Sequence, residues 1–145
     1  MKKALIIVGC FVIAAIAQLG NVGKLQEKFG LASRSGDDVF ESAFEEHRAN
    51  FVAEGSGTVT RVLSDDNEGS PHQRFIVTLP SGQTLLISHN IDLAHRVEGL
   101  AVGDPVSFKG EYEWNDKGGV VHWTHRDPEG RHEPGWIRHG GNTYE

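Results

Sequence analysis

The spacing of apolar residues changes from a helical period to a period of two near residue 55. Before that point Phe40, Phe44 and Phe51 recur at helical spacing, and acidic residues occupy the opposite face. We therefore expect an amphipathic helix of about 14 residues that begins near Asp37. Because short helices are seldom stable alone in water, its phenylalanines are expected to dock on the domain that follows, with a separate partner as the alternative.

Alternating residues after that point predict five strands. They are residues 58–63, 73–79, 83–88, 106–114 and 119–125. The second and third strands are expected to form a hairpin across a Pro-Ser-Gly turn at residues 80–82. Between the third and fourth strands, Asn90 or His89 is expected to cap a short helix that ends at Gly99.

The predicted order is strand, strand, strand, helix, strand, strand, which is typical of an OB-fold, a five-stranded Greek-key barrel. The fold class is therefore mainly β: an OB-fold-like five-stranded barrel with a short helix between strands 3 and 4, preceded by an N-terminal amphipathic helix and an export leader. A small β-sandwich is the competing architecture. The expected divisions are a leader at residues 1–17, a tether with the amphipathic helix at 18–54, and an OB-like domain with a histidine-rich C-terminal tail at 55–145.

The first residues have the features of a secretory signal peptide. Two lysines precede an uncharged stretch from Ala4 to Ala17, which ends in small residues before Gln18. We expect cleavage near Gln18 and an exported, periplasmic domain. The uncharged stretch continues to Gly23, so residues 4–23 are alternatively an uncleaved anchor in the inner membrane, and membrane contact is expected only through such a leader.

Cysteine content and charge exclude several functions. The single cysteine, Cys10, lies in the leader, so the exported domain can use no thiol as a nucleophile, metal ligand or disulfide partner. The chain has 14 basic and 20 acidic residues, and 12 basic residues remain without the two leader lysines. Such a domain repels a phosphate backbone on average, which disfavours nucleic acid as a partner.

Four strings of this sequence resemble a known family. They are HQRFI at residues 72–76, GQTLLISHNIDL at 82–93, GEYEWN at 110–115 and GVVHWTH at 119–125. These strings are similar to the secreted bacterial uncharacterised family grouped as domain of unknown function 3465, and the similarity extends over residues 55–144. The resemblance implies a short secreted protein and no particular activity.

The register of the last two strands can be predicted from their apolar faces. Only one face of residues 106–114 is apolar, and matching it to the next strand pairs Tyr112 with Val121. Glu111 then lies opposite His122, and such cross-strand pairs contribute up to about 1 kcal/mol.

The chain around and after this hairpin contains a possible metal site. Four potential ligands fall within 11 residues: His122, His125, Asp127 and His132. Imidazole nitrogens with one carboxylate suit zinc or another divalent transition metal. Alternation puts His122 and His125 on opposite faces of an ideal strand, so both reach one ion only if the strand ends or bulges near Thr124. The alternative is that these histidines make hydrogen bonds within a tail folded over the barrel.

Further candidates for ligand binding are scattered. They are His89, Asn90, Asp92, Glu111 and Trp136. The simplest role of the first three is to cap the helix expected after the third strand. Trp136 and its neighbour Ile137 are too apolar to be left in solvent, so the tail at residues 127–144 is expected to pack on the barrel. No motif fixes a nucleophile against a base, so catalytic residues stay unknown and the sequence leans against an enzyme.

Three functions remain open. The first is an exported OB-fold-like binding or scaffold module for an unknown small ligand, cation or envelope protein. The second is a metal-dependent hydrolase, nuclease-like in its chemistry, that uses the C-terminal His/Asp cluster. The third is an envelope metal-binding or stress-buffering protein.

Overall fold

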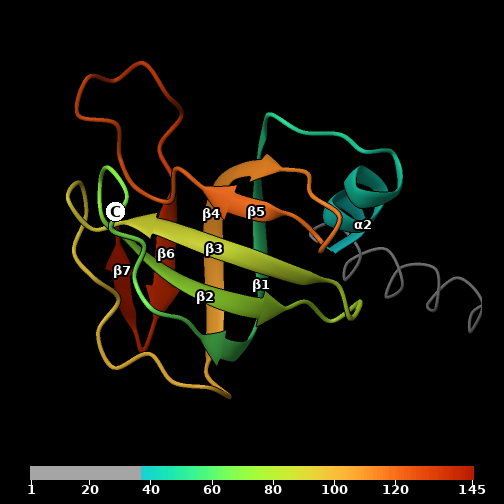
Figure 1. The fold of residues 1–145 in the computed structure, drawn as a ribbon, viewed down its shortest axis with the longest axis horizontal. Helices are drawn as coiled ribbons and strands as arrows, with labels where there is room; N and C mark the ends of the chain where they lie inside the picture. Colours follow the sequence, from blue (N-terminus) through green and yellow to red (C-terminus); the bar gives the residue numbers. More distant parts are fainter. Residues whose placement is uncertain (1–36) are drawn as a thin grey trace, which may run out of the picture. The chain divides into compact units, whose positions relative to one another are not determined.

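The computed structural model describes residues 37–145, which form one helix and seven strands (Figure 1). These elements are α2 (Asp37–Glu45), β1 (Phe51–Val62), β2 (His72–Thr78), β3 (Thr84–Asn90), β4 (Pro105–Glu113), β5 (Val120–His122), β6 (Trp136–His139) and β7 (Asn142–Tyr144). The predicted leader, its cleavage near Gln18, the alternative anchor at residues 4–23 and most of the tether lie outside the described residues. Within residues 37–145, no helix is long and apolar enough to cross a membrane.

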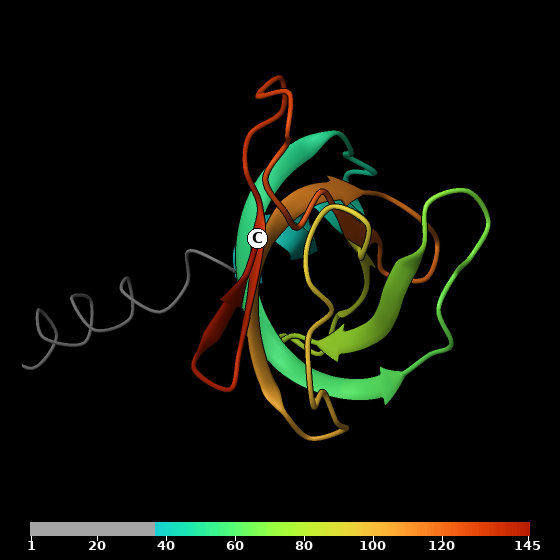
Figure 2. The ribbon, with the colours of Figure 1, turned by 90° about the vertical axis from the view of Figure 1, so that its left-hand side faces the viewer.

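Five of the strands close into a barrel. Antiparallel pairing joins β1 to β2, β2 to β3, β5 to β4 and β4 back to β1, and a parallel pair of β3 with β5 completes the ring. Figure 2 shows how these strands curve around the interior. The strand order confirms the expected mainly β, OB-fold-like barrel.

The length of β1 allows it to pair with two neighbours. Its first part pairs with β4 from Phe51 to Thr58, and its second part pairs with β2 from Thr58 to Val62. A shift in register between Val59 and Arg61 marks a bulge, which bends a strand and increases its twist. The barrel closes because this one strand serves both edges.

Alternation along β2, β3 and β4 separates a buried interior from a partly exposed outer face. The largest buried apolar side chains form a single cluster that includes Phe40, Phe75, Leu85, Ile87, Phe108, Tyr112 and Ile137. The side chains on the other face of β4 are polar or charged: Ser107, Lys109, Glu111 and Glu113.

The helix α2 is shorter than its sequence pattern predicted because a cap ends it. His47 adopts a left-handed conformation with φ 54°, and its amide donates to the Phe44 carbonyl at 3.3 Å. The Arg48 amide donates to the Ala43 carbonyl at 2.8 Å, which completes a Schellman motif. The expected extension of the helix to Phe51 is therefore wrong, and Phe51 begins β1 instead.

The same helix docks on the barrel, as expected. Phe40 is fully buried, and its ring centroid lies 5.9 Å from that of Phe108 and 5.7 Å from that of Tyr112. The indole Nε1 of Trp114 donates to the Phe44 carbonyl at 3.0 Å. Helix and barrel therefore share one core.

The segment expected to form a short helix between the third and fourth strands makes a single capped turn. Oδ1 of Asn90 accepts hydrogen bonds from the amides of Asp92 at 2.9 Å and Leu93 at 3.3 Å. Gln73, a buried residue of β2, then donates to the Val97 carbonyl at 3.1 Å and accepts from the Val97 amide at 2.8 Å. Because one side chain satisfies both backbone groups of Val97, that residue is not free to join a helical hydrogen-bond ladder.

The C-terminal tail packs on the barrel, as its apolar residues predicted, and it does so as strands. β6 pairs antiparallel with β4, from Ser107 opposite Arg138 to Lys109 opposite Trp136, and β7 pairs with β6. Ile137 is fully buried, whereas Trp136 is only partly buried and has the Arg138 guanidinium 3.9 Å from its ring centroid.

Candidate functional site

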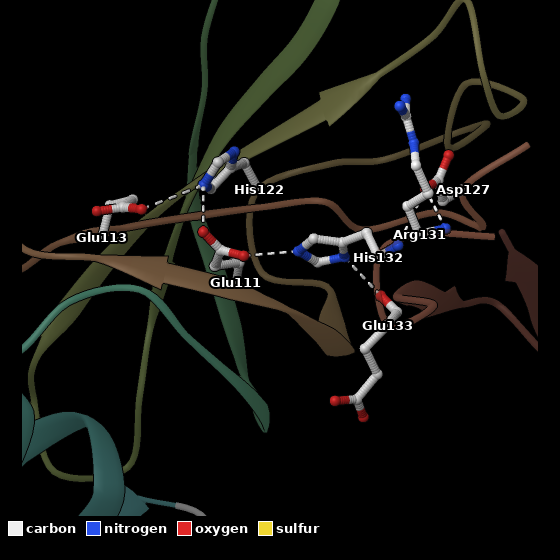
Figure 3. Close-up of polar contacts among 7 residues, drawn as sticks. All are labelled: Glu111, Glu113, His122, Asp127, Arg131, His132 and Glu133. Carbon is white, nitrogen blue, oxygen red and sulfur yellow. Dashed lines mark hydrogen bonds and ion pairs between the residues drawn. The ribbon is translucent and has the colours of Figure 1, made fainter. Parts of the chain in front are cut away.

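Two carboxylates of β4 lie beside an imidazole of β5. Glu111 and Glu113 are two residues apart and therefore share one face of the strand. Glu111 pairs with His122 and Tyr112 pairs with Val121, which confirms the predicted register. Nε2 of His122 lies 3.9 Å from Oε1 of Glu111 and 3.8 Å from Oε1 of Glu113 (Figure 3).

The Nε2 atom of His122 is shielded from solvent and has no hydrogen-bond partner within residues 37–145. Its separations from the two carboxylates exceed the length of a normal hydrogen bond. A buried polar group left unpaired costs about 1–3 kcal/mol. One ligand atom from each of Glu111, Glu113 and His122 lies within 4.8 Å of the others, so these three side chains could hold an ion between them.

A loop returns the chain to this face after β5. Trp123, the residue that follows β5, is left-handed with φ 52°. The loop at residues 123–135 closes with a hydrogen bond of 2.9 Å from the Gly135 amide to the His125 carbonyl. The closure requires glycine, because a Cβ at residue 135 would lie 2.0 Å from the carbonyl oxygen of Trp123.

His132 reaches Glu111 from this loop. Its Nε2 donates to Oε2 of Glu111 at 2.6 Å, and its Nδ1 donates to the Glu133 carbonyl at 2.7 Å. Its ring stacks on Trp123, with centroids 4.3 Å apart and planes 10° from parallel. We refer to Glu111, Glu113, His122 and His132 as the Glu–His cluster.

The contacts of His132 favour its charged form. Partial burial opposes the charge, but the hydrogen bonds to Glu111 and to the Glu133 carbonyl raise the pKa of His132 above its ordinary value. Both ring nitrogens have acceptors, which suits an imidazolium. One oxygen of Glu111 is therefore hydrogen-bonded to His132, and the other faces His122.

The four metal ligands predicted from the sequence are partly brought together. His122 and His132 both lie at Glu111. His125 is buried, and its Nδ1 donates to the Arg126 carbonyl at 2.7 Å. The strand does end before Thr124, as a shared site would require, but His125 is not a member of the group of Glu111, Glu113 and His122, whose ligand atoms lie within 4.8 Å of one another.

Asp127 shapes the loop. Its carboxylate accepts hydrogen bonds from the amides of Glu129, Arg131 and His132 at 2.9, 2.8 and 3.0 Å. These hydrogen bonds lower the pKa of Asp127, and the bond from the Glu129 amide has the largest effect. Partial desolvation of the carboxylate acts in the opposite direction. Figure 3 shows this carboxylate turned away from Glu111, on the far side of His132.

Among the other ligand candidates, His89 lies inside the barrel and not at a helix cap. Its Nε2 donates to the His95 carbonyl at 3.0 Å, and the Thr124 hydroxyl is hydrogen-bonded to its Nδ1 at 2.8 Å. Burial lowers the pKa of His89 to about 4, so the ring is neutral near pH 7. Asn90 caps the following turn and Asp92 is exposed, so neither belongs to the Glu–His cluster.

Glu113 is the member of the cluster that the sequence did not single out. An acidic pair two residues apart on a strand normally lies on a solvated edge. Here the informative signal is the combination of that pair with a histidine directly across the hairpin, which the predicted register already contained. The position of His132 carried no such signal, because it depends on the path of the loop.

The comparison with protein families identifies the chain. No curated protein matches it significantly. Residues 25–145 match the family described as Protein of unknown function (DUF3465), which agrees with the resemblance of the four sequence strings. Since the match covers most of the sequence, the chain belongs to DUF3465, a protein family of unknown function.

Proposed function

We propose that this chain is an exported, noncatalytic OB-fold binding module that holds a positively charged ligand at the Glu–His cluster. The observation that carries the proposal is the pair of carboxylates, Glu111 and Glu113, directed at a His122 nitrogen that has no hydrogen-bond partner among residues 37–145. The formal net charge of −6 favours a cation over an anion at long range as well. Small barrels of this architecture commonly bind ligands.

The position of the hydroxyl groups favours binding over hydrolysis. Within residues 37–145, Thr124 is the only serine or threonine whose hydroxyl is hydrogen-bonded to an imidazole, that of His89. Both side chains are fully buried. A nucleophile must reach its substrate, so this pair is unsuited to nucleophilic catalysis.

The composition of the outer face of β2 and β3 disfavours nucleic acid as a ligand. Its central residues, Ile76 and Leu86, pair across the two strands, and neither strand places a Phe, Tyr or Trp on this face. Arg74 lies there, but its Nε donates to the Ser64 carbonyl at 3.1 Å and its guanidinium lies 4.0 Å from Asp66. Single-stranded nucleic acid is usually bound by stacking aromatics and free cations.

Export is the part of the proposal that rests on residues 1–17. Their charged start, uncharged stretch and small residues before Gln18 are typical of a cleaved signal peptide. Mass spectrometry of the protein recovered from its producing cells tests this directly. A mature N-terminus near Gln18 in the periplasm is expected, and an intact chain recovered in membranes would replace export by anchoring.

Ligand binding can be tested by NMR on the untagged, 15N-labelled protein. Spermine, zinc chloride and an oligothymidylate serve as a polyamine, a metal and a polyanion. We expect at least one of the two cations to shift the amides of Glu111, Glu113 and His122, while the oligonucleotide leaves them unchanged. The double variant Glu111→Gln and Glu113→Gln should lose the response, and Glu129→Gln, which neutralises an exposed loop carboxylate, should keep it. The proposal fails if neither cation perturbs the cluster.

A further inference from the structure

We propose that the ligand of the Glu–His cluster is one divalent transition-metal ion, bound by Oε1 of Glu111, Oε1 of Glu113 and Nε2 of His122. The proposal rests on the proposed function, because it names the cation of that site. It replaces the ligand set predicted from the sequence, since Asp127 and His125 are engaged within the loop and Glu113 takes part instead.

The separations of the His122 nitrogen from the two carboxylate oxygens fit a shared ion. Nε2 of His122 lies 3.9 and 3.8 Å from the two carboxylate oxygens. Two atoms that bind one zinc ion at about 2.0–2.2 Å stand about 3.4 Å apart in a tetrahedron and cannot be more than about 4.4 Å apart. These two separations are too long for hydrogen bonds and need a contraction of only about 0.5 Å to match a tetrahedral edge. A ligand oxygen of Glu111 and one of Glu113 lie within 4.8 Å of each other, so these flexible side chains close the remaining gap when they bind the ion.

The unpaired nitrogen of His122 is a second observation, separate from the spacing, that favours a bound ion. A histidine of a surface ion pair normally donates its ring N–H to a carboxylate at hydrogen-bond distance. His122 has two carboxylates nearby and bonds to neither, while its Nε2 is shielded from solvent. A metal between the three side chains would satisfy this nitrogen and also relieve the repulsion between Glu111 and Glu113.

The donor atoms select the class of metal. One imidazole nitrogen with two carboxylate oxygens suits zinc and its first-row neighbours, whereas magnesium and calcium prefer sites made of oxygen alone. Two carboxylates also balance the charge of a divalent ion. The side chains of His122 and Glu113 are 34% and 36% exposed, so an ion can enter from that side and water can complete its coordination.

His132 acts on this site as a positioning residue. Its Nε2 donates to Oε2 of Glu111 at 2.6 Å, which leaves Oε1 of the same carboxylate directed at His122. Stacking on Trp123 and the bond to the Glu133 carbonyl fix the orientation of its ring. Hydrogen bonds of this kind to a metal-binding carboxylate commonly change metal affinity by about 10- to 100-fold.

Calorimetric titration of the untagged full chain with zinc, after dialysis against a chelator, tests the site. We expect one zinc ion per chain. Replacing a ligand, in His122→Gln or Glu113→Gln, should weaken binding at least about 100-fold, and His132→Gln should weaken it by about 10- to 100-fold. His95→Gln and Glu129→Gln, which alter an exposed imidazole and an exposed carboxylate, are matched controls that should bind like the original chain.

A spectroscopic readout separates the site from a general loss of folding. Cobalt bound at the cluster should give visible absorption bands of a nitrogen- and oxygen-ligated ion, and His122→Gln should remove them while its circular dichroism stays unchanged. The proposal is overturned if neither zinc nor cobalt binds, or if binding persists in both ligand variants. If spermine shifts the cluster by NMR but no metal binds, the metal proposal fails while the proposed function stands. If no cation acts on the cluster, both fail.

Discussion

His89 is a residue whose neutral form the fold requires. It is fully buried, and burial lowers its pKa to about 4. In the unfolded chain the pKa returns to about 6.5. As the pH falls from about 6.5 to 4, the unfolded chain takes up a proton that the folded chain resists, so the stability present at neutral pH is lost. His89 alone should lower the free energy of unfolding by about 3 kcal/mol over this range.

Urea unfolding at several pH values between 7 and 4 measures this effect. The decrease in stability with acid should be smaller in His89→Gln than in the original chain, because the substituted residue does not titrate. Carboxylates that titrate in both proteins cancel in the comparison. His95→Gln, which changes an exposed histidine, should keep the original pH dependence. Parallel curves for the chain and His89→Gln would contradict the assignment.

At the residue scale, strand alternation explains which side chains could be predicted. Alternation predicted the pairing of Glu111 with His122, because successive strand residues point to opposite faces of the sheet and the face of each residue is therefore known. The same parity, read from Leu85 and Ile87, places His89 inside the barrel. The capping role predicted for His89 was wrong because it was inferred from the residues next to His89 and not from the alternation of the strand.

The element that joins the tail to the barrel is β6, and two adjacent residues in it should contribute differently to the free energy of unfolding. Ile137→Ala removes a fully buried side chain and should lower the free energy of unfolding by about 2–5 kcal/mol. Trp136→Ala should cost less, because the ring is only partly buried and packs beneath Arg138 on the outer face. Equilibrium unfolding of the two variants measures both values. A larger loss for Trp136→Ala would mean that the tryptophan is the anchor of the tail.

Element boundaries were harder to predict than element types. The pattern of phenylalanines indicated a helix, but its end depends on the left-handed His47, and a left-handed histidine has no dependable sequence signal. The turn after β3 kept its predicted cap at Asn90, yet the contact between Gln73 and Val97 prevents a helix. That contact joins residues 24 positions apart, and local periodicity does not describe it.

At the scale of the whole molecule, the order of strands was predictable because each strand has its own alternating pattern and its own turns. The two additional strands of the tail were not predictable, although the packing of the tail on the barrel was. β6 and β7 are short, and β6 is placed by pairing with the N-terminal half of β4, beyond the point where β5 ends. The same arrangement carries the 123–135 loop across the outer face of β4, so the tail that extends the sheet also brings His132 to Glu111.

The folded unit of residues 37–145 should unfold as one cooperative system. Phe40 of α2 and Ile137 of β6 are buried in the same apolar cluster as the barrel strands, so no part of this cluster can open without exposing the rest. Phe40→Ala should therefore lower the free energy of unfolding by about 3–5 kcal/mol for the whole unit and not for the helix alone. Denaturant unfolding followed by tryptophan fluorescence, which reports on Trp114 beside α2, Trp123 after β5 and Trp136 on β6, should coincide with unfolding followed by far-ultraviolet circular dichroism. In Phe40→Ala both transitions should move together to lower denaturant with an unchanged slope. Transitions that separate, with the helix lost first, would instead make α2 a detachable cover over a barrel that is stable without it.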